Sequence, residues 1–224
     1  RLFAFKEATG ELLWVYDRTS PSLALRGTSR PAFGKGHIVA GFDTGRLAVI
    51  NIDEGLPLWE RIVGISQGRS DVERLSDIDA DPIIDNGTIF VAAYQDRFMA
   101  LELSSGRPLW EREISSYITP ALDNGLLFVV NERHEVWAFS ASNGATRWRQ
   151  KALTGRRLTQ PVVVGDLICV GDFEGYVHCL DRETGEQKGR FDSGLGEIRS
   201  SPVFDGHLLI VMGVDGRMSA IKIN

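Results

Sequence analysis

Several kinds of residue and segment are scarce in this chain of 224 residues. Cys169 and Cys179 are the only cysteines, which excludes a dense disulfide scaffold. The four histidines are isolated from one another and form no zinc-ligand pattern. No apolar run approaches the roughly 18 to 20 residues of a membrane-spanning helix. No basic-then-apolar leader opens the chain, so we expect any targeting segment to be absent or removed.

Clustered positive charge is also missing. The chain carries 25 Lys and Arg against 30 Asp and Glu, for a net charge of −5, and its cations are scattered. Nucleic-acid binding depends on grouped cations that release counterions. The composition therefore favours a protein partner or a small ligand.

Glycine is abundant, with 24 residues, and much of it belongs to a repeat. A Gly precedes a Trp by four residues in the pairs Gly10/Trp14, Gly55/Trp59, Gly106/Trp110 and Gly144/Trp148. A fifth copy, Gly185, has Gly189 in place of the Trp. Prolines 38 to 51 residues apart open strand-like runs at Pro31, Pro82, Pro120, Pro161 and Pro202. The period of roughly 40 residues is that of a repeat architecture.

Each repeat contains three short apolar runs separated by turn residues and a fourth run after the Gly. This pattern predicts four short antiparallel strands per repeat. Sheets of this kind that stack face to face form a β-propeller. We therefore expect an all-β protein, a β-propeller of four-stranded antiparallel blades.

The two ends of the chain hold incomplete repeats. Residues 1–18 contain only the last two strands of a blade, and residues 199–224 contain only the first three. We expect one propeller domain over 1–224 that is incomplete at its N-terminus, a C-terminal fragment with about five to six of eight blades. Exposed strand edges and an uncovered blade face are association hazards. The sequence leaves open whether the fragment is an open arc or self-associates.

The repeated tryptophans have a structural interpretation. A Trp at a fixed place in the fourth strand can wedge between neighbouring blades, because both faces of a blade must be buried. We expect this role for Trp14, Trp59, Trp110 and Trp148.

Two connections between repeats are longer than the others. Trp14 and Pro31 are 17 residues apart and Trp59 and Pro82 are 23 apart, whereas the corresponding distances elsewhere are 10 to 13. Every connection from a fourth strand to the next first strand emerges on the same rim, so the two insertions should lie side by side. Extra loop length on a rigid scaffold is where repeat proteins place binding function.

The composition of the insertions predicts a partner-binding surface. Leu23 and Leu25 next to Arg26 are typical of an interface anchor, although both leucines could instead pack back onto the rim. Asp77 and Asp79 alternate along an extended segment, which favours contact with a basic partner. A calcium site is disfavoured, because Pro82 and Thr88 occupy the positions of the Gly and Glu of an EF-hand loop.

The sequence contains no motif that is typical of a catalytic site. It has no nucleophile elbow and no phosphate-binding glycine loop before a helix, so we expect no enzyme activity, no cofactor and no metal. Asp172, like other aspartates between the second and third strands, is expected to serve turn geometry. Cys169 and Cys179 flank one such turn. Two buried thiols are the simpler interpretation, and a strained cross-strand disulfide is the alternative.

The repeat carries a resemblance to known families. The segments Glu7-Ala-Thr-Gly-Glu-Leu-Leu-Trp14 and Asp181-Arg-Glu-Thr-Gly185 resemble the repeat of the quinoprotein-like eight-bladed propellers. Three further segments are similar to the BamB family, the lipoprotein subunits of the outer-membrane β-barrel assembly machinery: Leu23-Ala-Leu-Arg-Gly-Thr-Ser29, Arg74-Leu-Ser-Asp-Ile-Asp79 and Gly171-Asp-Phe-Glu-Gly-Tyr176. The resemblance covers the whole chain and corresponds to the C-terminal part of that family.

This resemblance implies a function and a location. The family resemblance implies a non-enzymatic scaffold at the periplasmic face of the outer membrane, held by an N-terminal lipidated cysteine that this chain does not contain. It implies that positions matching Leu23, Leu25, Arg26, Asp77 and Asp79 dock onto the periplasmic POTRA domains of the central barrel subunit. Such a subunit would assist folding and insertion of β-barrel outer-membrane proteins, and their unfolded chains are a second expected partner. The alternative is a fragment of a quinone-cofactor-dependent dehydrogenase, which would need an adjacent cysteine pair and a metal cluster that the sequence lacks.

Overall fold

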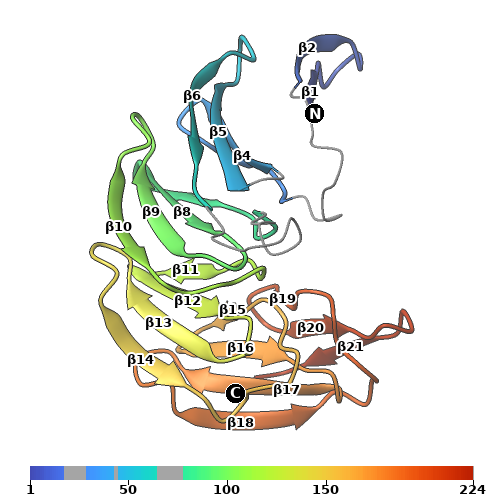
Figure 1. The fold of residues 1–224 in the computed structure, drawn as a ribbon. Helices are drawn as coiled ribbons and strands as arrows, with labels where there is room; N and C mark the ends of the chain where they lie inside the picture. The colour runs from blue at the N-terminus through green and yellow to red at the C-terminus, as the bar shows by residue number, and fades with distance from the viewer. Residues whose placement is uncertain (18–28, 43–44, 65–77, 224) are drawn as a thin grey trace, which may run out of the picture. The chain divides into compact units, whose positions relative to one another are not determined.

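The computed structural model describes residues 1–17, 29–42, 45–64 and 78–223. The chain divides into two compact units, Arg1–Tyr117 and Ile118–Asn224. The regular elements of the described residues are strands, and each sheet pairs strands that are consecutive in the sequence (Figure 1). Within these ranges no helix is long and apolar enough to cross a membrane. The predicted fold class, an all-β protein with four-stranded antiparallel sheets of the propeller type, is confirmed, whereas a single domain stays a prediction.

The first unit holds one two-stranded and two four-stranded sheets. The two-stranded sheet comprises β1 (Leu2–Phe5) and β2 (Leu12–Tyr16). The next sheet comprises β3 (Ala32–Gly34), β4 (His37–Phe42), β5 (Arg46–Asn51) and β6 (Pro57–Ile62). The third comprises β7 (Ile83–Asp85), β8 (Thr88–Ala92), β9 (Phe98–Glu102) and β10 (Pro108–Arg112).

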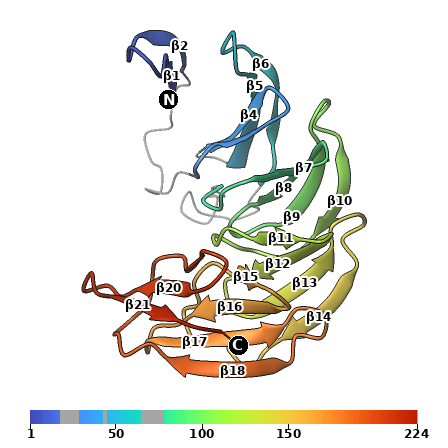
Figure 2. The ribbon, with the colours of Figure 1, turned by 180° about the vertical axis from the view of Figure 1, so that it is seen from behind.

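The second unit holds two four-stranded sheets and one three-stranded sheet. One comprises β11 (Ala121–Asp123), β12 (Leu126–Val130), β13 (Val136–Ser140) and β14 (Thr146–Gln150). The next comprises β15 (Val162–Val164), β16 (Leu167–Gly171), β17 (Tyr176–Asp181) and β18 (Gln187–Asp192). The last comprises β19 (Val203–Phe204), β20 (Leu209–Met212) and β21 (Met218–Ile221), and in both views it lies beside the β15–β18 sheet (Figures 1 and 2).

Turn chemistry explains why the strands reverse where they do. The residues Asn86-Gly87 and Asn124-Gly125 join the first two strands of their sheets, and all four have φ between 45° and 83°. Two successive residues with positive φ form the tight hairpin turn whose twist matches that of antiparallel strands, and Asn-Gly is the preferred pair there. The repeat of these dipeptides therefore sets the spacing between first and second strands.

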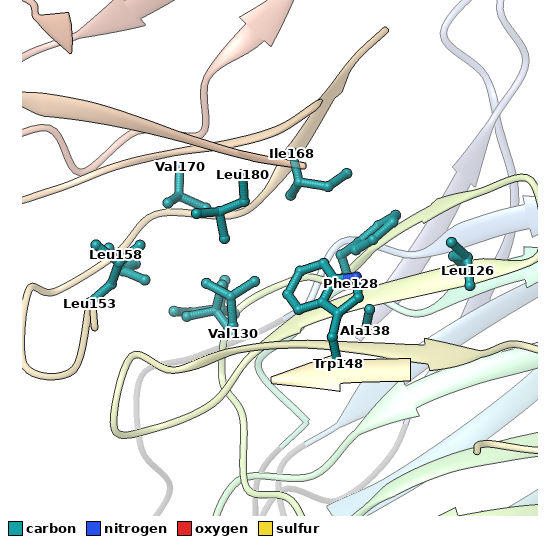
Figure 3. Packing of buried hydrophobic residues seen from close by; sticks show 12 residues of the cluster. Leu126, Phe128, Val130, Ala138, Trp148, Leu153, Leu158, Ile168, Val170 and Leu180 are labelled. Carbon is teal, nitrogen blue, oxygen red and sulfur yellow. The ribbon is translucent and has the colours of Figure 1, made fainter. Parts of the chain in front are cut away.

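The core of the second unit lies between the β11–β14 and β15–β18 sheets. Phe128, Ala138 and Trp148 stand opposite one another on three successive strands and point toward Ile168 and Leu180 of the next sheet (Figure 3). Successive strand residues face opposite sides of a sheet, so Leu126, Phe128 and Val130 of β12 share the face that lies in this core.

The repeated Trp of one sheet packs on the repeated Gly of the next. The indole Nε1 of Trp14, Trp59 and Trp148 donates a hydrogen bond of 2.8 Å to the carbonyl of Ile52, Leu103 and Arg182, respectively. A Cβ placed on the glycine three residues later, Gly55, Gly106 or Gly185, would lie 2.5 to 2.9 Å from the same indole ring.

Two physical demands therefore keep these positions glycine. The φ angle of Gly185 is +72°, which disfavours other residues, and the indole of Trp148 leaves no room for a side chain. Trp110 and Trp148 are each 8% exposed. Trp110 stacks on Phe98 within its own sheet, with ring centroids 5.9 Å apart.

The interpretation of Cys169 and Cys179 as two free buried thiols is wrong, because the structure joins them in a disulfide. The two residues are directly opposite on β16 and β17, with their Cα atoms 4.1 Å apart. Directly opposite residues of an antiparallel pair come this close where they do not exchange backbone hydrogen bonds. The register of the hairpin thus brings the sulfur atoms together.

Candidate functional site

The predicted partner-binding residues lie in the two long connections, of which the structure describes only the ends. Leu23, Leu25, Arg26 and Asp77 lie outside the described residues. Asp79 lies within them and is partly buried. The site is therefore built here from the segments that lead into and out of the two connections.

The ends of the two connections are in direct contact. The backbone N–H of Arg30 donates a hydrogen bond of 2.6 Å to Oδ1 of Asp81. Arg30 directly precedes Pro31 and Asp81 directly precedes Pro82, and each proline comes just before the first strand of its sheet. The second unit repeats the arrangement, because Ser201 Oγ donates to Oε1 of Gln160 at 2.9 Å in the equivalent positions. The described ends of the two long connections thus lie side by side.

The second connection rejoins the repeat at Ile78. This side chain is 1% exposed and lies so close to Gly41 that a Cβ there would be 2.5 Å from Ile78 Cγ2. The same contact recurs in the second unit, where a Cβ on Gly171 would be 2.8 Å from Ile198 Cγ2. The extra length of the second connection is therefore confined to the residues before Ile78.

The segment from Ile78 to Pro82 alternates between buried and partly exposed residues. Ile78, Ala80 and Pro82 are buried, whereas Asp79 and Asp81 are partly exposed. This is the pattern of an extended segment with one face on the core. Asp79 and Asp81 share the other face, and the Oδ1 atom of Asp79 is itself buried.

The β3–β6 sheet anchors both connections at one turn. Ser29, at the end of the first connection, is 8% exposed, and its Oγ would lie 2.7 Å from a Cβ on Gly41. At the start of the second, the N–H groups of Val63 and Gly64 donate to the carbonyl of Gly45 at 2.7 and 3.2 Å. The backbone after the first predicted binding loop and on both sides of the second is thus held by buried contacts.

The equivalent turn of the second unit holds a buried charge network that sequence reasoning missed. Asp172 is fully buried, and its Oδ1 accepts the N–H groups of Glu174 and Tyr176, each at 2.9 Å, which is the turn role expected of it. Its Oδ2 also binds His178 Nε2 at 2.8 Å and Arg156 Nε at 2.6 Å. Arg156, which lies in the connection from β14 to β15, additionally pairs with Glu174.

Burial and hydrogen bonding shift the pKa values of this network. Burial lowers the pKa of the His178 imidazole, and the Asp172 carboxylate opposes that shift only in part. Burial alone would raise the pKa of Asp172, but the hydrogen bonds from His178, Tyr176 N–H and Arg156 together lower it. The network therefore holds an ionised carboxylate beneath the connection that contains Arg156.

A second buried carboxylate lies in the turn between β12 and β13. Glu135 is 5% exposed and accepts hydrogen bonds from Arg149 Nη2 at 2.6 and 2.8 Å. The guanidinium of Arg149 also lies 4.3 Å from the centre of the Trp137 ring. Arg156 and Arg149 lie 16 and 14 residues from the carboxylates that they bind and belong to no motif with them, so no spacing in the sequence indicated these pairs. Among the described residues, no three of His, Cys, Asp and Glu gather in a manner suited to a metal ion.

Comparison with protein families and curated sequences gives a consistent result. The chain matches the family described as outer membrane protein assembly factor BamB over residues 1–150 and 144–224. It is 39% identical over 203 residues to the assembly factor BamB of Alkalilimnicola ehrlichii, covering 91% of this chain and 53% of that protein. It is 38% identical over 212 residues to that of Vibrio cholerae, covering 93% and 55%. The chain thus spans about half the length of the curated relatives it matches.

Solved structures show the same likeness. The crystal structure of BamB from Moraxella catarrhalis superposes with a TM-score of 0.88 at 26% identity, covering 99% of this chain and 66% of that one. A europium-containing methanol dehydrogenase superposes with a TM-score of 0.65 at 13% identity, covering 85% and 47%. At that identity, the second likeness concerns the fold alone.

Proposed function

Because the chain belongs to the family of the outer membrane protein assembly factor BamB, we propose that it is a non-enzymatic scaffold that binds the POTRA domains of the central barrel subunit. In this proposal the whole protein lies at the periplasmic face of the outer membrane and is held there by a lipid anchor. It assists the folding and insertion of β-barrel outer-membrane proteins. It requires no cofactor.

The observation that carries the proposal is the contact between the ends of the two long connections. The hydrogen bond from Arg30 N–H to Asp81 Oδ1 joins the two segments that flank the predicted binding residues. Buried contacts of Ser29, Ile78 and Val63 hold the same segments on one sheet. A rigid base of this kind limits the conformations of the loops it carries, which lowers the entropic cost of ordering them on a partner.

The residues of the loops then divide into two roles. Leu23 and Leu25 supply apolar area to the interface, and Arg26 pairs with a carboxylate of the partner. Asp77 and Asp79 pair with basic groups of the partner. Charged pairs at the edge of an interface contribute more to orientation and specificity than to affinity, so the leucines should dominate the binding free energy.

The proposal is tested by calorimetric titration of the chain with the soluble POTRA domains. The Leu25→Ala, Asp77→Arg double variant should lose most of the affinity while keeping its circular dichroism spectrum. A matched control is the Leu58→Ala, Asp53→Arg double variant, which makes the same chemical changes at an exposed position of β6 and an exposed position of the turn between β5 and β6. It should bind like the parent.

Two results would contradict the proposal. A folded parent that does not bind the POTRA domains would remove the partner. Equal losses in the two double variants would remove the assignment of the binding surface to the long connections.

A further inference from the structure

The β15–β18 sheet lacks the tryptophan that its neighbours carry. In the other sheets the residue opposite the Trp on the third strand is Ala4, Val49, Ala100 or Ala138. In the β15–β18 sheet the corresponding pair is Cys179 and Gly189. The strand register therefore identifies Gly189 as the tryptophan position.

The whole row across this sheet is made of small residues. In the β11–β14 sheet the row facing the next sheet reads Phe128, Ala138 and Trp148. In the β15–β18 sheet it reads Cys169, Cys179 and Gly189, with the two cysteines joined in a disulfide. The β15–β18 sheet thus has a cysteine and a glycine where the β11–β14 sheet has a phenylalanine and a tryptophan. Two aromatic rings are therefore missing from the space between the β15–β18 and β19–β21 sheets.

A cavity lies at the tryptophan position of this row, where Gly189 and Cys179 line it. Its volume is about 460 Å³, within the range of roughly 300 to 1,000 Å³ typical of ligand sites. Its apolar wall includes residues of the β15–β18 sheet, of the β19–β21 sheet and of the segment after β21. They are Val164, Leu167, Cys179, Phe204 and Ile223. Gly189 lines it directly, and the exposed side chains of Lys188 and Asp166 lie at its edge.

The ring of Phe191 occupies only part of the tryptophan position. A Cβ on Gly189 would lie 2.9 Å from Phe191 Cε2, so this ring covers the glycine itself. The cavity remains beside it, and Phe191 forms one of its walls. An aromatic wall of this kind suits a second aromatic ring in an offset or edge-to-face arrangement.

The backbone acceptor of the tryptophan position is also present by register. In the β15–β18 sheet Leu180 pairs with Ile168. The carbonyl that accepts the indole N–H of Trp148 belongs to Arg182, two residues after Leu180. In the last sheet Ile221 pairs with Leu209, and two residues further on is Ile223, a wall of the cavity. Ile223 thus corresponds to the residue whose carbonyl receives the indole N–H in three preceding sheets.

We propose that this cavity binds the indole side chain of a tryptophan supplied by a partner polypeptide. In the described residues Trp14, Trp59 and Trp148 each place an indole in this position and donate an N–H to carbonyl hydrogen bond. Cys179, which lines the cavity, offers the polarisable sulfur of its disulfide to the ring. Lys188 and Asp166 at the edge suit the polar main chain of an extended peptide. The site is independent of the proposed POTRA surface.

The test is a titration of the ¹⁵N-labelled chain with N-acetyl-tryptophanamide, followed by amide chemical shifts. Saturable shifts of Gly189, Phe191 and Leu167 are the expected result, with N-acetyl-leucinamide binding at least about tenfold more weakly. This measurement uses the unaltered chain and does not depend on any variant folding.

Variants and a second probe sharpen the test. Gly189→Trp should fill the cavity and abolish the shifts. Gly196→Trp, which adds an indole at an exposed glycine with open space around it, should bind like the parent. Shifts that are absent, that map elsewhere, or that appear equally with N-acetyl-leucinamide would overturn the proposal. Binding of free indole without binding of N-acetyl-tryptophanamide would overturn the assignment to a polypeptide side chain.

Discussion

Replacement of Trp148 by alanine should destabilise the second unit strongly. The indole is 8% exposed, lies between two sheets with its ring on Gly185, and donates a hydrogen bond of 2.8 Å to the carbonyl of Arg182. Truncation of a buried tryptophan costs about 3 to 5 kcal/mol, because apolar burial is lost and a cavity is left. For a chain of this size that corresponds to a fall in melting temperature of roughly 6 to 20 °C.

The Trp148→Ala loss is measured by urea unfolding followed by circular dichroism, with the slope against urea checked for constancy. Trp148→Phe keeps most of the ring area but loses the N–H, so it should cost far less than alanine, with about 1 kcal/mol from the hydrogen bond. A loss below about 1 kcal/mol in Trp148→Ala, with an unchanged slope, would refute the wedge role of this residue.

The glycine under the indole gives a complementary measurement. Gly185→Ala adds a Cβ 2.5 Å from the Trp148 ring at a φ of +72°, whereas Gly125→Ala adds one in open space at +75°. Both variants carry the cost of positive φ, about 1 to 2 kcal/mol, and only Gly185→Ala also displaces the ring, which adds about 1 to 3 kcal/mol. The excess should vanish when Gly185→Ala is made in the Trp148→Ala background. Its persistence there would show that the ring is not its cause.

Two further predictions concern the pH dependence of stability and the reduction of the disulfide. Because the folded state lowers the pKa of His178, stability should decline as the pH falls below the unfolded value of about 6.5, and the lowered pKa of Asp172 adds a further decline below about pH 3.9. Burial also lowers the pKa of His134, so His178→Gln should reduce, and not abolish, the fall of the urea midpoint between about pH 7 and 5. His207→Gln, at an exposed position, should leave that fall unchanged, and a parent midpoint that is constant over this range would contradict the prediction. Reduction of the disulfide between Cys169 and Cys179, 10 residues apart, should cost up to about 3 kcal/mol. Dithiothreitol should lower the urea midpoint of the parent and not that of the double alanine variant, and an equal fall in both would contradict the prediction.

The repeat made most of the fold predictable from the sequence. Prolines and glycines at fixed offsets mark the boundaries of short strands, so the four strands after Pro161 lie close to where the pattern places them. The register also follows, because the side chains of a strand alternate and a shift by one residue would expose the core face. The sheets β1–β2 and β19–β21 have two and three strands, at positions where the sequence pattern marks apolar runs.

The contacts that hold the candidate site could not be predicted in the same way. The close approach of Ile78 to Gly41 depends on three-dimensional packing and not on a periodic signal. Asp172 matches the turn pattern, but its bonds to Arg156 and His178 join residues with no common motif. The predicted turn between Cys169 and Cys179 indicated that the two residues lie on opposite strands of one hairpin. Their disulfide also requires that they stand directly opposite each other, and this register was not predicted from the sequence.

The central claim, that the two long connections form the partner-binding surface, is tested most directly by site-specific crosslinking. A photoreactive phenylalanine derivative at position 25 is irradiated in the presence of the soluble POTRA domains, beside the same derivative at position 58, where Leu58 is 50% exposed on β6. We predict a crosslinked product from position 25 and none from position 58. Crosslinking from position 58 alone, or equally from both positions, would contradict the account.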